Sequence, residues 1–239
     1  VYSLVSNGVK QLINACLSGI AHTVGQAYAK KDWDEINQKL DIYEYIVFVL
    51  VFFFFTVKAL LITPFIQLYT KGIIDTDYSR PLFGILLVVS EALYLIKLPH
   101  LNLAYSANKF KEITIPAYIE ALLNIGISVL LVRKFGLIGV TVGTIAGMTY
   151  RMIFHVYYTS KIVPGRVQSI FYKKLFVFTA GTGIGFVICG ELIPIRNVTV
   201  LNWILHAIIY CVIIGCIVLV VSIRFFKKEL RFFVQYVRK

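Results

Sequence analysis

The chain has 239 residues, of which 59% are hydrophobic and only 15% are charged, and its formal net charge is +12. Soluble globular domains contain about 25% charged residues, so this chain lacks the polar side chains to cover a core in water. The composition excludes a soluble enzyme, a nucleic-acid-binding domain and a secreted disulfide scaffold. The basic residues punctuate apolar runs instead of forming one face, which indicates a membrane surface as their partner and not nucleic acid.

Hydrophobic segments recur along the whole chain. A helical span needs about 20 mostly apolar residues, and seven segments are candidates: residues 1–29, 43–68, 81–106, 113–133, 137–160, 172–194 and 200–223. The first is the most polar. The connections are short, so we predict one all-α, polytopic transmembrane domain over residues 1–239. Because residue 1 already lies inside a helical pattern, we expect the chain to be the C-terminal part of a longer protein.

The distribution of Lys and Arg predicts the direction of the spans. Fifteen of these residues follow the first, third, fifth and seventh segments, whereas five follow the second, fourth and sixth. Basic loops stay on the cytoplasmic side. We therefore expect a cytoplasmic C-terminus, ending in a basic and aromatic tail over 224–239 that suits an anionic membrane surface.

Polar side chains form a stripe along the first segment. After Ser3, the stripe residues Asn7, Lys10, Gln11, Asn14, Ser18 and His22 follow at steps of three and four, and the opposite face is apolar. This spacing places them on one side of a helix, as expected for a cavity wall that contacts polar or anionic substrate groups. The alternatives are a helix that lies in the membrane interface and a helix packed against a polar partner outside this chain.

The third segment carries charges beside a proline. Glu91 and Lys97 are six residues apart and so lie on different faces, and Pro99 removes the hydrogen bond to the Leu95 carbonyl. We therefore predict a kink near Lys97. A charged kink is typical of a gating element, and interhelical ion pairing is the alternative interpretation.

The fourth and fifth segments repeat the pattern more weakly. Glu120 and Asn124 share a face with Ser128, and Arg151 shares a face with Met148, among others. Ionisable groups at membrane depth face the protein interior or water. We interpret Arg151 as a second substrate contact, and Glu91, Lys97, Glu120 and Asn124 as sites of ion coupling or ion pairing. The alternative is that Glu91, Lys97, Glu120 and Arg151 form interhelical ion pairs that hold the bundle together.

Glycines spaced four apart predict close helix packing at 139, 143 and 147 and again at 181 and 185.

The four cysteines form no C-x-x-C pair and lie in apolar stretches, where we expect buried thiols. No nucleophile–base pair, metal-ligand spacing or phosphate-binding loop is recognisable. We therefore predict no catalytic group, no metal and no cofactor.

Three segments resemble the C-terminal half of bacterial polysaccharide and O-antigen repeat-unit flippases. They are 107–111 (ANKFK), 121–128 (ALLNIGIS) and 134–144 (KFGLIGVTVGT). These belong to the multidrug/oligosaccharidyl-lipid/polysaccharide exporter superfamily. The opening stretch, from 1–4 (VYSL) to 27–32 (AYAKKD), looks like the cavity-lining helix that begins the family's second lobe. The resemblance covers essentially the whole chain, but its loose motifs indicate the superfamily better than the cargo.

The resemblance implies one seven-helix lobe of a two-lobe, alternating-access transporter in the bacterial inner membrane. Its substrate would be an undecaprenyl-pyrophosphate-linked oligosaccharide, with Lys10, and secondarily Arg151, contacting the pyrophosphate. The missing N-terminal lobe and membrane lipids would be its partners, and a proton or sodium ion could be coupled. The alternative is a cation-coupled multidrug exporter of the same superfamily. A seven-helix receptor and an intramembrane glycan ligase or polymerase fit the segments less well.

Overall fold

The computed structural model describes residues 2–73 and 78–237, without the side chains of 3–6 and 234–237. The start of the expected first segment and the last two residues of the basic tail lie outside this description. The described residues form the helices α1 (Tyr2–Lys30), α2 (Trp33–Tyr69), α3 (Pro81–Ile96), α4 (Leu98–Ser106), α5 (Phe110–Phe135), α6 (Leu137–Ile162), α7 (Gln168–Leu192), α8 (Val200–Phe225) and α9 (Lys227–Val237). The predicted all-α class is confirmed.

Within the described residues, six helical segments are long and apolar enough to cross a membrane: α2, α3 together with α4, α5, α6, α7 and α8. The chain is therefore a polytopic, all-α membrane protein. We expected seven spanning segments, and six qualify among the described residues. The difference is α1, which forms a helix from Tyr2 to Lys30 but is too polar to count as a span. Helix α2 also starts ten residues earlier than expected, since Asp32 caps it by accepting a hydrogen bond from the Glu35 amide, 2.9 Å away.

The predicted kink is present. Helix α3 ends at Ile96 and α4 begins at Leu98, so Lys97 is the residue between them, two positions before Pro99. Because proline has no amide hydrogen, the helical ladder is interrupted and the chain bends at this point. The bend places the Lys97 side chain in the protein interior, where it is 4% exposed.

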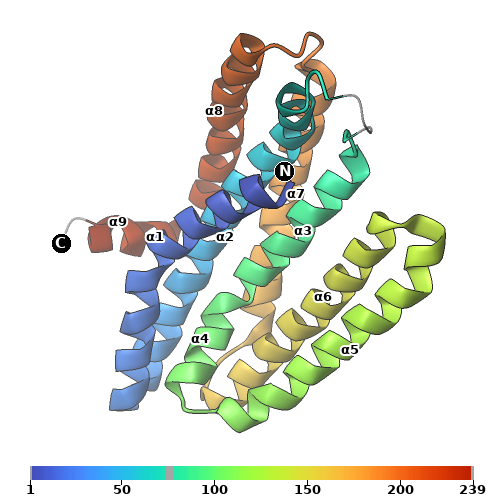
Figure 1. Cartoon of the computed structure of the whole chain (residues 1–239). Helices are drawn as coiled ribbons and strands as arrows, with labels where there is room; N and C mark the ends of the chain where they lie inside the picture. Colours follow the sequence, from blue (N-terminus) through green and yellow to red (C-terminus); the bar gives the residue numbers. More distant parts are fainter. Residues whose placement is uncertain (1, 74–77, 238–239) are drawn as a thin grey trace.

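Helix α2 is the centre of the bundle. It packs against α1 and α3 on one side and against α7 and α8 on the other, whereas the α5–α6 hairpin contacts the rest mainly through α6 (Figure 1). Aromatic rings fill the interface with α7. Phe48 and Phe52 of α2 stack on Phe178 of α7, with centroids 5.9 Å away in both pairs. These stacked rings, of which Phe48 and Phe178 are fully buried, fix α7 against α2.

The glycine spacing does bring α5 and α6 together. A Cβ added at Gly143 would lie 2.3 Å from the Ser128 hydroxyl, and one at Gly139 would lie 2.6 Å from the Leu131 backbone. Gly136 forms the turn between the two helices with a φ of +55°, a conformation that favours glycine. On the other side of the molecule, Gly185 is packed against Ile214 of α8 in the same way. The interpretation of these glycines as packing residues is confirmed.

The cysteine prediction is wrong for part of the set. Cys189 is buried and Cys211 is half-buried, but Cys16 and Cys216 are exposed at the protein surface. Cys216 lies on the apolar helix α8, so a bilayer and not a protein core is its natural surrounding. Hydropathy alone does not distinguish these two apolar surroundings.

Candidate functional site

The candidate site is built around Tyr94 on α3. The ammonium group of Lys10, from α1, lies 5.0 Å from the centroid of the Tyr94 ring, and that of Lys97 lies 5.2 Å from the same centroid. Both distances are within the range of a cation–π contact. The ring therefore links the polar stripe of α1 to the kink between α3 and α4.

An acid held between two bases continues the site. Glu120 of α5 accepts a hydrogen bond from Lys97 at 3.2 Å through one oxygen and from Arg151 of α6 at 3.1 Å through the other. Arg151 also donates from its Nε atom to Nε2 of His155, 2.8 Å away. Arg151 and His155 are buried, and Glu120 is partly exposed. These contacts join α5 and α6 to the kink.

The other carboxylate of the region belongs to a different pair. Glu91 of α3 forms a salt bridge with Lys58 of α2, and both side chains are nearly buried. The Lys58 side chain thus points into the protein and not toward the lipid. The ion-pair interpretation of Glu91, Lys97, Glu120 and Arg151 therefore describes their contacts, with Lys58 as the partner that the sequence did not indicate.

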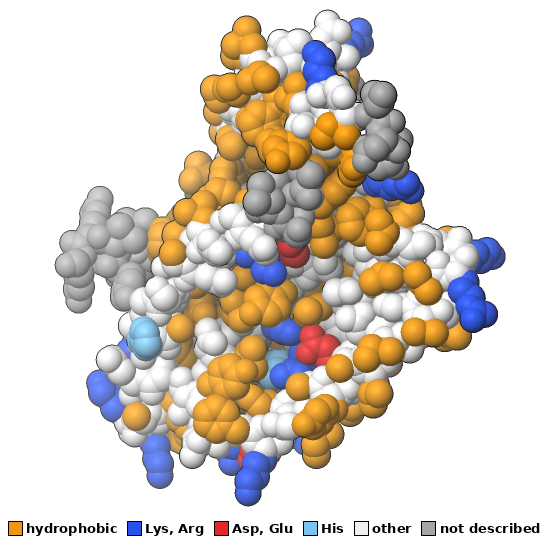
Figure 2. Space-filling view, viewed as in Figure 1, with side chains coloured by type: hydrophobic (Ala, Val, Ile, Leu, Met, Phe, Trp, Pro, Cys, Tyr) orange, Lys and Arg blue, Asp and Glu red, His pale blue; other side chains and the backbone are white. Residues whose placement is uncertain are grey.

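The stripe on α1 follows the predicted division into two faces. Ile13 and Leu17 are buried, whereas the stripe residues are exposed, except that Lys10 is half-buried. The exposed residues are Asn7, Gln11, Asn14, Ser18 and His22. Figure 2 shows a hollowed central area of this face, where basic and acidic side chains gather. The stripe thus has no protein cover, and whether it lines a substrate cavity stays a prediction.

The site is electropositive by count. Among the described residues, its charged groups are four bases and two acids: Lys10, Lys58, Lys97, Arg151, Glu91 and Glu120. The two acids are each engaged by a base, and within the described residues Lys10 forms no ion pair. A charge at membrane depth is costly unless it is paired or hydrated. The excess of two positive charges can therefore bind an anionic group, with Lys10 at its most accessible point.

Asn124 has a packing role. Its side-chain oxygen accepts hydrogen bonds from Ser128 at 3.2 Å and from Thr144 at 3.4 Å. These contacts tie α5 to α6 beside the close approach at Gly143. Asn124 is therefore part of the hairpin interface, one turn from Glu120, and its side chain does not contact the charged groups of the site.

Sequence reasoning missed a second buried charge cluster. Glu44 of α2, which is fully buried, pairs with Arg166 of the α6–α7 connection and with Lys174 of α7, 2.9 Å away. His100 of α4 lies 3.3 Å from the same carboxylate. Asp41, one turn before Glu44, accepts from Arg166 at 2.9 Å and from Lys174 at 3.0 Å. An acid inside a candidate span was the available signal.

Burial by itself would lower the pKa of Arg166, but the adjacent carboxylates of Glu44 and Asp41 outweigh it, so the pKa of Arg166 is raised. The guanidinium therefore stays charged, and two bases balance two acids in this cluster. Because the cluster joins α2, α4 and α7 and is closed to solvent at Glu44, it holds the helices together.

Comparisons with protein-family models, with curated proteins and with solved structures each found no match for this chain. The fold and the sites define the class: a polytopic, all-α membrane protein with an electropositive site between α1, α3 and the α5–α6 hairpin.

Proposed function

We propose that the chain is the C-terminal lobe of an alternating-access flippase that moves an undecaprenyl-pyrophosphate-linked oligosaccharide across the bacterial inner membrane. In this proposal α1 is the seventh spanning helix, the C-terminus is cytoplasmic, and an N-terminal lobe completes the cavity. In this proposal the protein forms no covalent bond with its substrate and acts without a cofactor.

The observation that carries the proposal is the position of Lys10. Its ammonium group lies over Tyr94 at the junction of an exposed amide-rich stripe and a net-positive cluster. A pyrophosphate needs cations, and a glycan needs hydrogen-bonding partners such as amides. A stripe of Asn and Gln beside an ammonium group supplies both along a single helix.

The kink at Lys97 gives a physical route for movement. Lys97 joins Tyr94 to Glu120, so an anion that attracts Lys97 competes with Glu120 for the same ammonium group. Weakening the Lys97–Glu120 contact loosens the α5–α6 hairpin from the kink. The other base that holds Glu120 is Arg151, which lies on α6 of the same hairpin and does not tie it to the kink. Binding of the anion would in this way shift the balance between two helix packings.

Charge reversal at Lys10 tests the proposal. In a strain that lacks the full-length gene, lipid-linked oligosaccharide is quantified on each face of the inner membrane after complementation. Wild-type protein should relieve accumulation on the cytoplasmic face, whereas Lys10→Glu should not, at equal membrane abundance. Lys111→Glu, an exposed reversal away from the site, should complement fully.

Full complementation by Lys10→Glu would contradict the site assignment. No accumulation in the deletion strain, with increased drug sensitivity instead, would favour the multidrug exporter. That alternative requires a carboxylate available to a proton or sodium ion. Glu91 and Glu120 are both paired with bases in this structure, which favours the flippase.

A further inference from the structure

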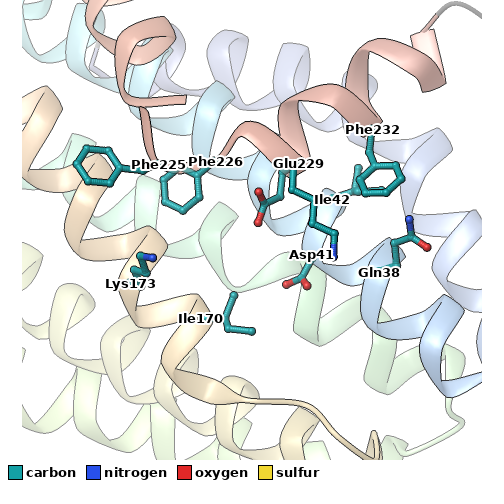
Figure 3. A pocket seen from close by; sticks show the side chains of 10 residues that line it. Gln38, Asp41, Ile42, Ile170, Lys173, Phe225, Phe226, Glu229 and Phe232 are labelled. Carbon is teal, nitrogen blue, oxygen red and sulfur yellow. The ribbon is translucent and has the colours of Figure 1, made fainter. Parts of the chain in front are cut away.

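A pocket of about 290 Å³, lined by five polar or charged side chains and five apolar ones, lies where α9 crosses α2 and α7. Figure 3 shows Asp41 and Gln38 on α2, Lys173 on α7, and Glu229 and Phe232 on α9 around it. Pockets for small molecules are about 300–1,000 Å³. This volume lies just below that range, so it suits a small group and not a whole lipid or nucleotide.

The two faces of α9 indicate where this pocket lies relative to the bilayer. Helix α9 leaves the end of α8 at a steep angle (Figure 1). Leu230 and Phe233 line an apolar groove between α2 and the spanning helix α8, whereas Lys228, Glu229 and Phe232 line the polar pocket. An amphipathic helix with this division lies in the membrane interface. The polar pocket therefore opens at headgroup level.

The charged side chains that line the pocket and have no ion pair carry a net charge of one positive unit. Asp41 is already neutralised, because Arg166 and Lys174 both contact its carboxylate. Within the described part of the chain, Lys173, Lys228 and Glu229 form no ion pair. Two bases and one acid thus face the pocket without internal partners, which complements a ligand that carries one negative charge and also donates hydrogen bonds.

We propose that this pocket binds the phosphoglycerol headgroup of an anionic phospholipid in the leaflet on which α9 lies. Lys173 and Lys228 contact the phosphodiester, which carries the single negative charge. The glycerol hydroxyls donate hydrogen bonds to the carboxylate of Glu229 and to the amide oxygen of Gln38. A headgroup that carries phosphate but neither hydroxyls nor an ammonium group would leave Glu229 unpaired beside an anion, which explains an acid in a basic pocket.

The site is separate from the transported substrate. It shares no residue with the cluster around Tyr94, and it depends only on the membrane position of α9. Absence of headgroup binding by the wild-type protein, with transport confirmed in the Lys10 test, would overturn this inference alone, and failure of the proposed transport function would leave it standing.

The test measures lipid binding to the full chain, purified in detergent, by titration with phosphatidylglycerol, phosphatidylethanolamine and phosphatidic acid of identical acyl chains. Bound lipid is counted by native mass spectrometry. We expect a preference of at least tenfold for phosphatidylglycerol over phosphatidylethanolamine. The double variant Lys173→Gln/Lys228→Gln should bind phosphatidylglycerol about 30-fold more weakly. The matched control Lys30→Gln/Lys111→Gln removes two exposed charges elsewhere and should bind normally.

A third variant tests the role of the acid. Glu229→Gln should reduce the preference for phosphatidylglycerol over phosphatidic acid, because the charge that accepts from the hydroxyls and repels a bare phosphate is gone. Equal binding of phosphatidylglycerol and phosphatidylethanolamine, or equal losses in both double variants, would overturn the proposal. Displacement by soluble glycerol 3-phosphate without any lipid preference would overturn the lipid as the source of the headgroup.

Discussion

Removal of the Glu44 charge is the most informative perturbation of the fold. Glu44→Gln preserves the shape of the side chain but leaves Arg166 and Lys174 with only Asp41 as counter-charge. Glu44 and Lys174 are both fully buried, so water cannot replace the lost partner. Breaking a buried pair by removing one partner costs about 3–5 kcal/mol. We expect Glu44→Gln to lower the free energy of unfolding by an amount in this range.

A double-mutant cycle separates charge imbalance from loss of packing. Lys174→Met alone leaves excess negative charge, whereas Glu44→Gln/Lys174→Met restores the balance, with Arg166 facing Asp41. The double variant should therefore lose about 2 kcal/mol less than the sum of the two single variants, within the range measured for residues in one network.

The assay is reversible unfolding of the purified chain by SDS in mixed micelles, followed by circular dichroism. Glu112→Gln is the control, because Glu112 pairs with Lys109 at 3.2 Å on the surface and should unfold like the wild type. A loss below about 1 kcal/mol for Glu44→Gln, or full additivity in the cycle, would refute the reasoning that this cluster depends on charge balance.

Two further predictions concern packing. Gly143→Ala should destabilise the α5–α6 hairpin by about 1–3 kcal/mol, because the added Cβ would overlap α5. Gly126→Ala is the control. Its added Cβ would meet no atom within 4 Å, so this variant should be neutral or stabilising in the same SDS titration. Phe226→Ala should accelerate hydrogen exchange in α9 at least tenfold, because the Phe226 ring stacks on Phe178 at a centroid distance of 5.3 Å and fixes the start of α9. Phe225 is exposed, so Phe225→Ala should leave the exchange rate unchanged. Equal exchange rates in the two variants would contradict this role of Phe226.

Local chemistry explains why much of the fold was predictable. The apolar runs, the proline at 99 and the glycine spacing in α6 act on their own helix or on the next one, so the pattern in the sequence is sufficient. The first segment was harder, because a polar stripe predicts a helix equally well at an interface and beside a cavity. The structure confirms that α1 is a helix with one buried face, but in the described part of the chain six segments and not seven meet the criteria for spanning.

The charged residues show where sequence reasoning stops. The cost of an isolated charge in a bilayer implied that Glu91 and Lys97 would find partners. It did not identify Lys58 as the partner of Glu91, because any base on a neighbouring helix would satisfy the same requirement. Arg166 was counted only as a cytoplasmic loop residue, although it extends inward to Glu44.

The sequence by itself determined the solvent, the helical class, the kink and the glycine contacts, because each depends on composition or on neighbours along one chain segment. Tertiary structure alone decided which charges meet: Lys10 and Lys97 on Tyr94, Glu120 between two bases, and Glu44 in a closed cluster. The physical reason is that electrostatic pairing requires contact distance. Contact between distant helices depends on how the whole bundle packs around α2.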